Sequence, residues 1–291
     1  MKVSIIIPNY NTWDLVKRNI TACLKYDDDL IEEIIVVDDC SPTLNYIHFP
    51  SKVKIIRNET NLHYTKTVNI GLKNAISDIL VLLDSDAYPT KPFIKDLILQ
   101  FEDLNIGCIG FKTINDLGDD SGNFMYFPSA YGLIAGQQIH KFLKKYDRRR
   151  NRKIIPFSCA VSFRKNCLKD LNYFDDYFPV LDADIDLCYR IYESKWKLIY
   201  HPEIEIYHVG GNSIPKDSKR VLLFYKSRWQ LLKKFHLIPF PIITKSLILS
   251  RLLLETLIIK LKIILYTDIR PYYKLKLKGR KELIEMVKHF N

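Results

Sequence analysis

The chain has 291 residues, of which 47% are hydrophobic and 12% aromatic, which excludes a disordered chain and suits one large α/β domain with or without an appendage. The formal net charge is +11, but residues from 216 onward hold 18 Lys and Arg against 5 Asp and Glu, so the first 215 residues are nearly neutral. An anionic partner is therefore expected at the C-terminal quarter.

Short apolar runs alternate with helical patterns along the first part of the chain. The predicted strands are Val3–Ile7, Ile34–Val37, Val53–Ile56, Ile79–Leu83 and Ile106–Phe111; helices are predicted after Thr12, over Thr65–Ala75 and over Pro92–Phe101. This alternation indicates βαβ units and a mostly parallel central sheet flanked by helices. Further on, the patterns predict a strand over Ile154–Phe163 and a hairpin formed by Leu198–His201 and Ile204–Tyr207.

Polar side chains follow three of these strands, at Pro8–Asn11, Asp38–Ser41 and Asp84–Asp86. In an extended chain Asp84 and Asp86 point to one side, with Ser85 opposite. Two such close carboxylates repel each other, and a cation placed between them and a phosphate relieves the repulsion. A solvated turn would also explain the three residues. Because ligands of parallel sheets bind beyond the carboxyl ends of the strands, the agreement of the three clusters favours a binding site.

Several other kinds of site lack their motifs. No Gly-x-Gly-x-x-Gly follows an early strand and no Gly-x-x-x-x-Gly-Lys-Ser/Thr occurs, which argues against a dinucleotide dehydrogenase and a P-loop phosphohydrolase. The six cysteines are scattered without a Cys-x-x-Cys pair, so buried thiols in a reduced, cytosolic setting are expected. Val3–Ile7 is too short for a signal-peptide core.

A second acidic stretch comes near residue 184. Asp182, Asp184 and Asp186 alternate at the start of a predicted helix, with Asp184 at the N-cap. The helix dipole would hold one carboxylate ionised there, which explains one of the acids but not three. Downstream, His208 follows a predicted strand and precedes two glycines. A lone His is usually a surface residue, but small neighbours permit close approach of a ligand.

Together and in this order, the motifs resemble those of the inverting family-2 glycosyltransferases, which have the GT-A fold. The matching stretches are Ile6–Asn11, Val36–Ser41, Asn58–Gly71, Leu83–Asp86, Phe174-Asp175, Asp184–Arg190 and His208–Gly211. The resemblance implies a GT-A catalytic domain over residues 1–215, followed by a basic, amphipathic helical region over residues 216–291. Tyr225–His236 is also similar to the segment that follows the catalytic domain in the rhamnosyltransferase-like branch.

The resemblance also implies roles for individual residues. Asp39, with Asp38 beside it, is similar to the carboxylate that accepts the pyrimidine N–H of the nucleotide, and the expected donor is a UDP-, dTDP- or GDP-sugar. Asp86 and His208 resemble the ligands of Mg²⁺ or Mn²⁺, and Asp84 the neighbour that faces the ribose or a metal-bound water. The general base is expected at Asp184 or, because Ala183 stands where the family usually has Glu, at Asp182. The other expected donor-binding residues are Pro8, Asn9, Tyr10, Asn69 and Ser85.

The implied reaction is a single displacement that inverts the configuration of the sugar. The expected acceptor is a hydroxyl of a glycan or lipid-linked saccharide in cell-surface polysaccharide synthesis. Cys40, His63 and Cys159 stand where the family commonly has Gly, which leaves donor and acceptor open. The alternatives are a nucleotidyltransferase that makes sugar nucleotides, whose glycine-rich loop is missing, and a basic nucleic-acid-binding protein, whose motifs are missing; no nucleic acid is expected.

The basic C-terminal region is also apolar. A helix is predicted over Leu222–Phe235, and Ile242–Tyr266 is very apolar but interrupted by five charged residues, which argues against a span. It suits a helix lying in the membrane interface or docking on another protein, with packing on the catalytic domain as the alternative. Lys274–Lys281 adds a polybasic patch for anionic lipid, so a cytoplasmic protein peripheral to the inner face of the cell membrane is expected. Lys141–Lys153 is interpreted as a mobile loop, or as a flap that meets a phosphate.

Overall fold

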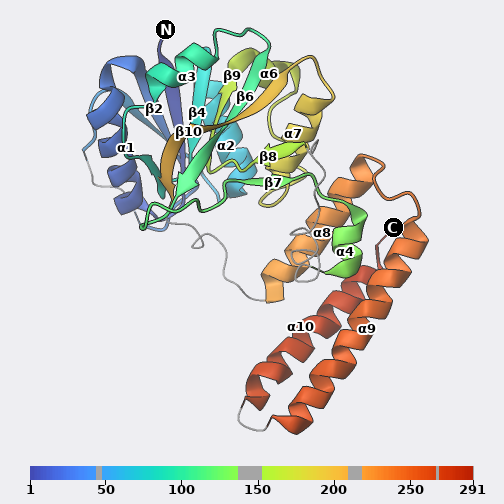
Figure 1. The fold of residues 1–291 in the computed structure, drawn as a ribbon. Helices are drawn as coiled ribbons and strands as arrows, with labels where there is room; N and C mark the ends of the chain where they lie inside the picture. Colours follow the sequence, from blue (N-terminus) through green and yellow to red (C-terminus); the bar gives the residue numbers. More distant parts are fainter. Residues whose placement is uncertain (44–47, 137–152, 209–217, 267–268, 291) are drawn as a thin grey trace. The chain divides into compact units, whose positions relative to one another are not determined.

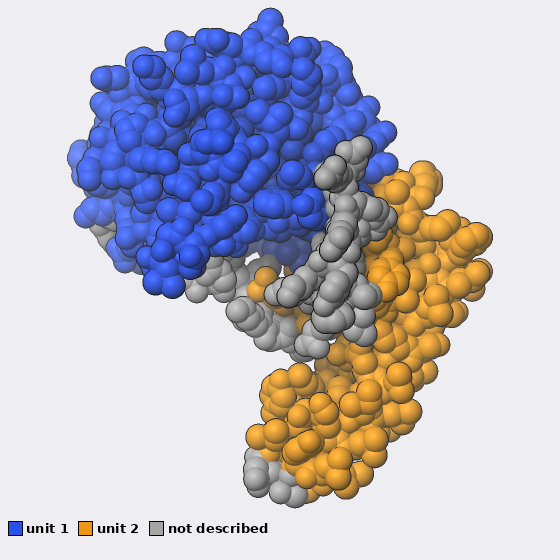
Figure 2. All heavy atoms as spheres, viewed as in Figure 1, with its two compact units in different colours: residues 1–127, 153–211 blue, residues 128–152, 212–291 orange. Residues whose placement is uncertain are grey.

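The structure is a computed structural model that describes residues 1–291 except 44–47, 137–152, 209–217, 267–268 and 291. The contacts divide the chain into two compact units (Figure 2), residues 1–127 with 153–211 and residues 128–152 with 212–291. The second unit therefore takes in α4 (Ala130–Ala135), which the sequence analysis places in the catalytic domain. The basic stretch 141–152 lies outside the described residues.

The first unit is built on an eight-stranded sheet with the order β3-β2-β1-β4-β9-β6-β10-β5 (Figure 1). Its strands are β1 (Val3–Asn9), β2 (Ile31–Asp38), β3 (Val53–Arg57), β4 (Ile79–Leu83), β5 (Ala87–Pro89), β6 (Ile106–Ile114), β9 (Ala160–Arg164) and β10 (Lys197–His208). Six of them run in one direction, and only β9 and β5 run against their neighbours. The prediction of a mostly parallel α/β sheet is confirmed.

Burial on both faces explains the apolar character of the central strands. Every residue of β1 and β4 is buried, and alternate side chains of these strands, such as Ile5 and Val81, enter one core with side chains of β2 and β6. The helices beside the sheet are α1 (Trp13–Asp27), α2 (His63–Asn74), α3 (Ile94–Gln100), α6 (Lys165–Asp170) and α7 (Ala183–Tyr192). α2 packs very closely on β1. A Cβ added at Gly71 of α2 would lie only 2.5 Å from Ile6 Cγ2 of β1.

Two predicted elements are wrong. The hairpin expected from 198 to 207 is one strand, β10, whose two halves both pair with β6; the register slips between His201 and Glu205. Pro202 lies in this irregular segment, where a residue without an N–H is tolerated. The strand expected over Ile154–Phe163 is two strands: β9 joins the large sheet, whereas β8 (Ile154–Pro156) pairs with β7 (Phe124–Tyr126).

The second unit is helical. Its long helices are α8 (Ser218–Lys234), α9 (Pro241–Leu265) and α10 (Arg270–Lys288), so the predicted polybasic patch lies on a helix. α9 and α10 lie side by side (Figure 1). Leu133 of α4, Trp229 of α8 and Leu252 of α9 share a buried core with residues of α10. Within the described ranges, no helix combines the length and the apolar character needed to cross a membrane.

Candidate functional site

The carboxyl ends of the parallel strands β1, β2, β4 and β10 share one edge of the sheet, so the polar residues that end them gather there. These residues are Asn9, Asp38, Asp84 and His208. Strand β5 runs against β10 and pairs Ala87 with His208, which places the preceding Asp86 beside the imidazole. The topology, more than any local motif, brings together residues more than 120 positions apart in the chain.

Asp84, Asp86 and His208 form a cluster of possible metal ligands. Each offers one ligand atom within 4.8 Å of the others, and His208 Nε2 lies 3.4 Å from Asp86 Oδ1. Neighbouring ligands of an octahedral Mg²⁺ lie about 3 Å apart, so small side-chain movements would complete this geometry. Two carboxylates and one imidazole together could hold a divalent metal ion.

The chain turns directly after β4 and does not remain extended. The Ala87 N–H donates to the Asp84 carbonyl over 2.9 Å, so the predicted alternation of Asp84, Ser85 and Asp86 on an extended strand is wrong. The turn is held by buried Asn19 of α1, whose Nδ2 donates to the carbonyls of Asp84 (3.0 Å) and Ala87 (2.6 Å). The two carboxylates nevertheless converge on one cluster, because this turn and β5 return the chain toward His208.

The ionisation of this cluster depends on burial and on its own charges. Burial, opposed by the Tyr64 hydrogen bond and reinforced by the charge of Asp86, raises the pKa of Asp84 to about 6. For His208, burial lowers the pKa, but the hydrogen bond and charge of Asp86 and the charge of Asp84 outweigh it, so the pKa is raised overall. The two carboxylates repel each other, and a divalent cation bound between them would relieve this repulsion.

Tyr64 is a site residue that the sequence analysis missed. Its hydroxyl donates to Asp84 Oδ1 over 2.9 Å and lies 3.1 Å from Ser158 Oγ. Burial and then the charge of Asp84 hold its pKa well above the usual value, so the phenol stays a donor. Tyr64 precedes Val68 and Leu72 at helical intervals, and both of these are buried, so the same periodicity that marked the core face of α2 could have identified it.

Replacing Tyr64 with Phe is expected to weaken the binding of Mn²⁺ by roughly 10-fold, because residues that orient a metal ligand typically contribute 10–100-fold to affinity. The measurement is a calorimetric Mn²⁺ titration of the purified chain. Tyr192→Phe is the matched control, since its hydroxyl also donates one hydrogen bond (2.8 Å, to the Ile154 carbonyl) but contacts no cluster residue. Equal Mn²⁺ affinity in the two variants would show that Tyr64 does not position Asp84.

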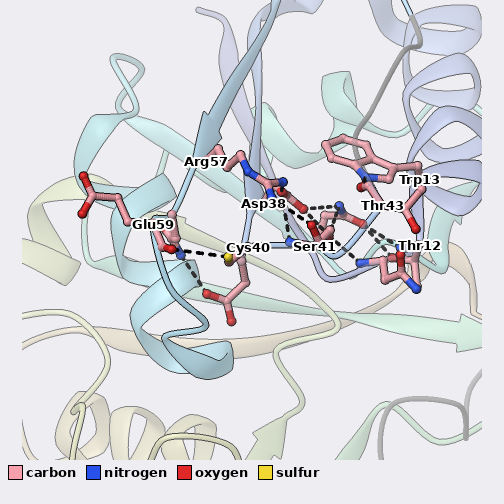
Figure 3. Close-up of polar contacts among 12 residues, drawn as sticks. Thr12, Trp13, Asp38, Cys40, Ser41, Thr43, Arg57 and Glu59 are labelled. Atoms are coloured by element: carbon pink, nitrogen blue, oxygen red, sulfur yellow. Dashed lines mark hydrogen bonds and ion pairs between the residues drawn. The ribbon is translucent and has the colours of Figure 1, made fainter.

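The loop after β2 is fixed by Asp38 (Figure 3), which is fully buried. Its Oδ1 accepts from Asn9 Nδ2 over 2.7 Å and from the Ser41 hydroxyl, and its Oδ2 pairs with the Arg57 guanidinium. Arg57 also donates to the Ser41 carbonyl over 2.8 Å. These bonds use both carboxylate oxygens of Asp38 within the protein, so its geometry suits holding the loop in place more than contacting a ligand.

Asp39 is differently placed. Its Oδ1 accepts from Asn58 Nδ2 (2.9 Å) and from the Leu62 N–H (2.7 Å), whereas Oδ2 accepts no hydrogen bond from the described part of the chain. Cys40 follows with φ of 61°, in the left-handed region that non-glycine residues seldom adopt, and its thiol donates to the Glu59 carbonyl (Figure 3). Asp39 thus has an oxygen available to accept an N–H of a ligand.

The remaining predicted donor-binding residues have mixed surroundings. Pro8 is buried within β1, and Tyr10 is exposed. Ser85 accepts from the Thr12 hydroxyl over 2.9 Å, which links the loops after β1 and β4. Asn69 lies apart: its amide donates to the Phe174 carbonyl (2.8 Å) and Asp176 Oδ1 (3.0 Å) and accepts from the Phe174 N–H. Asn69 therefore anchors the segment that leads to Asp182.

The two candidate bases differ from the predicted arrangement. Asp182, not Asp184, occupies the N-cap position of α7; it is buried, and its φ of 66° is left-handed. The helix begins at Ala183 because this turn precedes it, so Asp184 lies in the first helical turn, half-buried, with Oδ1 accepting from the Ile185 N–H over 2.9 Å. Asp186 is fully buried and paired with Arg190 (2.7 Å), which explains the third acid as structural.

The Cys159 thiol is affected by acids of both the metal-ligand cluster and α7. Burial, followed by the charges of Asp84, Asp184 and Asp86, raises the pKa of its thiol well above the usual value. Its carbonyl also accepts from the Asp84 N–H over 2.9 Å. Asp184 therefore acts on the Cys159 thiol together with the two carboxylates of the metal-ligand cluster.

Comparisons with known proteins show similarity of this chain to sugar-transferring enzymes. The family model described as Glycosyl transferase family 2 matches residues 4–171. In Staphylococcus aureus, poly(ribitol-phosphate) beta-N-acetylglucosaminyltransferase TarS is 35% identical over 149 residues, which are 48% of this chain and 26% of TarS. The chain spans less than half the length of the first curated relatives it matches.

Two solved structures share the fold. S. aureus TarS 1–349 in complex with UDP-GlcNAc matches with a TM-score of 0.55 and 19% identity, over 79% of this chain and 65% of that one. The mannosyltransferase PcManGT from Pyrobaculum calidifontis, in complex with GDP-Man and Mn²⁺, matches with a TM-score of 0.58 and 14% identity, over 99% of this chain and 86% of that one.

Proposed function

Because the chain belongs to Glycosyl transferase family 2 and has the GT-A fold, we propose that it transfers a sugar, with inversion, from a nucleotide diphosphate sugar to a hydroxyl group. The observation that carries this proposal is the convergence of Asp84, Asp86 and His208 beyond the strand ends, at the same edge of the sheet as Asp39. The solved neighbours were crystallised with UDP-GlcNAc and with GDP-Man and Mn²⁺, which supports a nucleotide-sugar donor.

In this reaction Asp39 would accept an N–H of the base, and the loop fixed by Asp38 would hold it in position. Asp86 and His208 would hold Mg²⁺ or Mn²⁺, with Asp84 as a third ligand or as the acceptor for a metal-bound water. When bound, such an ion neutralises the diphosphate and stabilises its departure. Asp184 would take the proton of the acceptor hydroxyl as it attacks from the face opposite the diphosphate, with Asp182 as the alternative base.

The expected acceptor is a glycan or lipid-linked saccharide of a cell-surface polysaccharide. Lipid-linked acceptors are presented at a membrane, so the proposal includes a cytoplasmic protein attached peripherally to the inner face of the cell membrane. The basic, apolar second unit supports this location, because Lys and Arg near an anionic leaflet attract it.

A panel of UDP-, dTDP- and GDP-sugars, each with and without Mn²⁺, tests the donor. Since a ligand that binds only the folded state stabilises it by mass action, a donor at 100 times its Kd adds about 2.7 kcal/mol, or roughly 5–10 °C in Tm. We expect one nucleotide class to raise Tm only with Mn²⁺ and to release a nucleoside diphosphate. Release of pyrophosphate from a nucleoside triphosphate would instead identify a nucleotidyltransferase.

A further inference from the structure

Helix α9 has an apolar face on each of two sides. One face, formed by Thr244, Ile248, Leu252, Thr256 and Ile259, is buried. The other carries large aliphatic side chains that are each 44–72% exposed: Leu247, Leu254, Leu257, Ile258, Leu261 and Leu265. Apart from the adjacent pair Leu257 and Ile258, their steps of three, four and seven residues place them along one side of the helix, and we call them the outward stripe of α9.

The charged residues of α9 lie away from the outward stripe. Arg251 pairs with Glu255, whose other oxygen lies 2.9 Å from Arg280 of α10, so these charges serve the contact between the two helices. At 100° per residue, Lys260 and Lys262 project beside the stripe and not within it. A solvent-facing helix would carry its charges on the stripe, so this face is unusual for a surface exposed only to water.

Cationic side chains are abundant on the two helices α9 and α10. Together α9 and α10 contain 11 Lys and Arg against 3 Glu. On α10, the exposed Lys274, Lys276, Lys278 and Lys281 accompany the exposed Tyr272 and Leu275. An exposed apolar stripe on a strongly cationic pair of helices suits a lipid interface, whose acyl boundary takes aliphatic groups and whose anionic headgroups attract cations.

Charge also decides between a bilayer and a second copy of this chain. Residues 216–291 hold 18 Lys and Arg against 5 Asp and Glu, so two copies meeting through this unit would bring like charges together. We propose that the outward stripe of α9 inserts into the interface of an anionic bilayer, with the helix in the membrane plane and the lysines of α10 on the headgroups. This inference deepens the proposed membrane location but depends only on the second unit.

The test is flotation of the full chain with vesicles of neutral phosphatidylcholine, with or without 30% phosphatidylglycerol. We expect binding to the anionic vesicles and at least 10-fold weaker binding of Leu257→Glu/Leu261→Glu. The control Leu99→Glu/Leu104→Glu changes two exposed leucines of the first unit and should bind like the unmodified chain. Lys274→Gln/Lys276→Gln/Lys278→Gln should lose the preference for anionic lipid.

Two results would overturn the proposal. One is equal vesicle binding by the unmodified chain and by Leu257→Glu/Leu261→Glu. The other is a dimer of the unmodified chain, detected by light scattering, that is lost in this variant while vesicle binding stays unchanged. That result would show that the stripe binds a second copy of the chain. If the variant does not fold, Leu257→Ser/Leu261→Ser replaces it. The donor should still stabilise the unmodified chain and the variant in the presence of Mn²⁺. If it does, a failed vesicle experiment rejects only the membrane inference and not the proposed transferase.

Discussion

Asp86→Ala is expected to abolish Mn²⁺-dependent donor binding while leaving the fold intact. Asp86 lies 3.4 Å from His208 and between Asp84 and β5, so its removal takes one of only two carboxylates from the cluster of Asp84, Asp86 and His208. Losing a direct ligand removes more affinity than losing a residue that orients one, for which 10–100-fold is typical, so we expect a loss of more than 100-fold. The readouts are the calorimetric Kd for Mn²⁺ and the donor-induced shift in Tm.

Asp96→Ala is the matched control for this variant, because Asp96 is an exposed acid of α3 in the same unit. It should bind Mn²⁺ and donor normally. If Asp86→Ala bound Mn²⁺ as well as Asp96→Ala does, the metal site would not be the cluster of Asp84, Asp86 and His208.

Asp184→Asn is expected to keep donor binding and to lose turnover by 10²–10⁴-fold, the range that a positioned general base typically contributes. Asparagine has the shape of the carboxylate and can accept the Ile185 N–H as Asp184 does, but it cannot take a proton. The measurements are kcat from nucleoside diphosphate release and the donor-induced shift in Tm of the same preparation.

The companion variant is Asp182→Asn. Asn tolerates left-handed φ at least as readily as Asp, so this change should preserve the turn before α7. Near-normal turnover in Asp184→Asn with loss in Asp182→Asn would assign the base to Asp182. Loss of donor binding in Asp184→Asn would show that this residue contributes to the donor site and not only to proton transfer.

The sheet and the acids at its edge could be predicted because they follow from local rules. Apolar runs such as Ile79–Leu83 predict buried strands, and parallel strands end at one edge, so Asp38 and Asp84 were expected there. Sequence alone could also suggest His208, as a residue ending a strand. Its meeting with Asp86 depends on β5 pairing antiparallel to β10, which no local pattern specifies.

The residues that support the site were harder to predict, because their roles depend on tertiary contacts. Asn19 of α1 fixes the turn at Asp84, and Tyr64 of α2 donates to its carboxylate, yet neither lies in an acidic motif. The start of α7 was misplaced by two residues because the left-handed φ of Asp182 cannot be recognised from an Asp-rich stretch. Similarly, β10 continues as one strand past Pro202 because both halves of β10 pair with β6.

The division of the second unit into two chain segments has a consequence for synthesis on the ribosome. Leu133 of α4 is buried by residues of α8 and α9, which begin more than 80 positions later. At about 5–20 residues per second, α4 waits roughly 4–16 s for the first of these partners. During that interval Leu133 lacks the side chains that bury it in the folded chain, so α4 cannot complete its packing before α8 and α9 have been made.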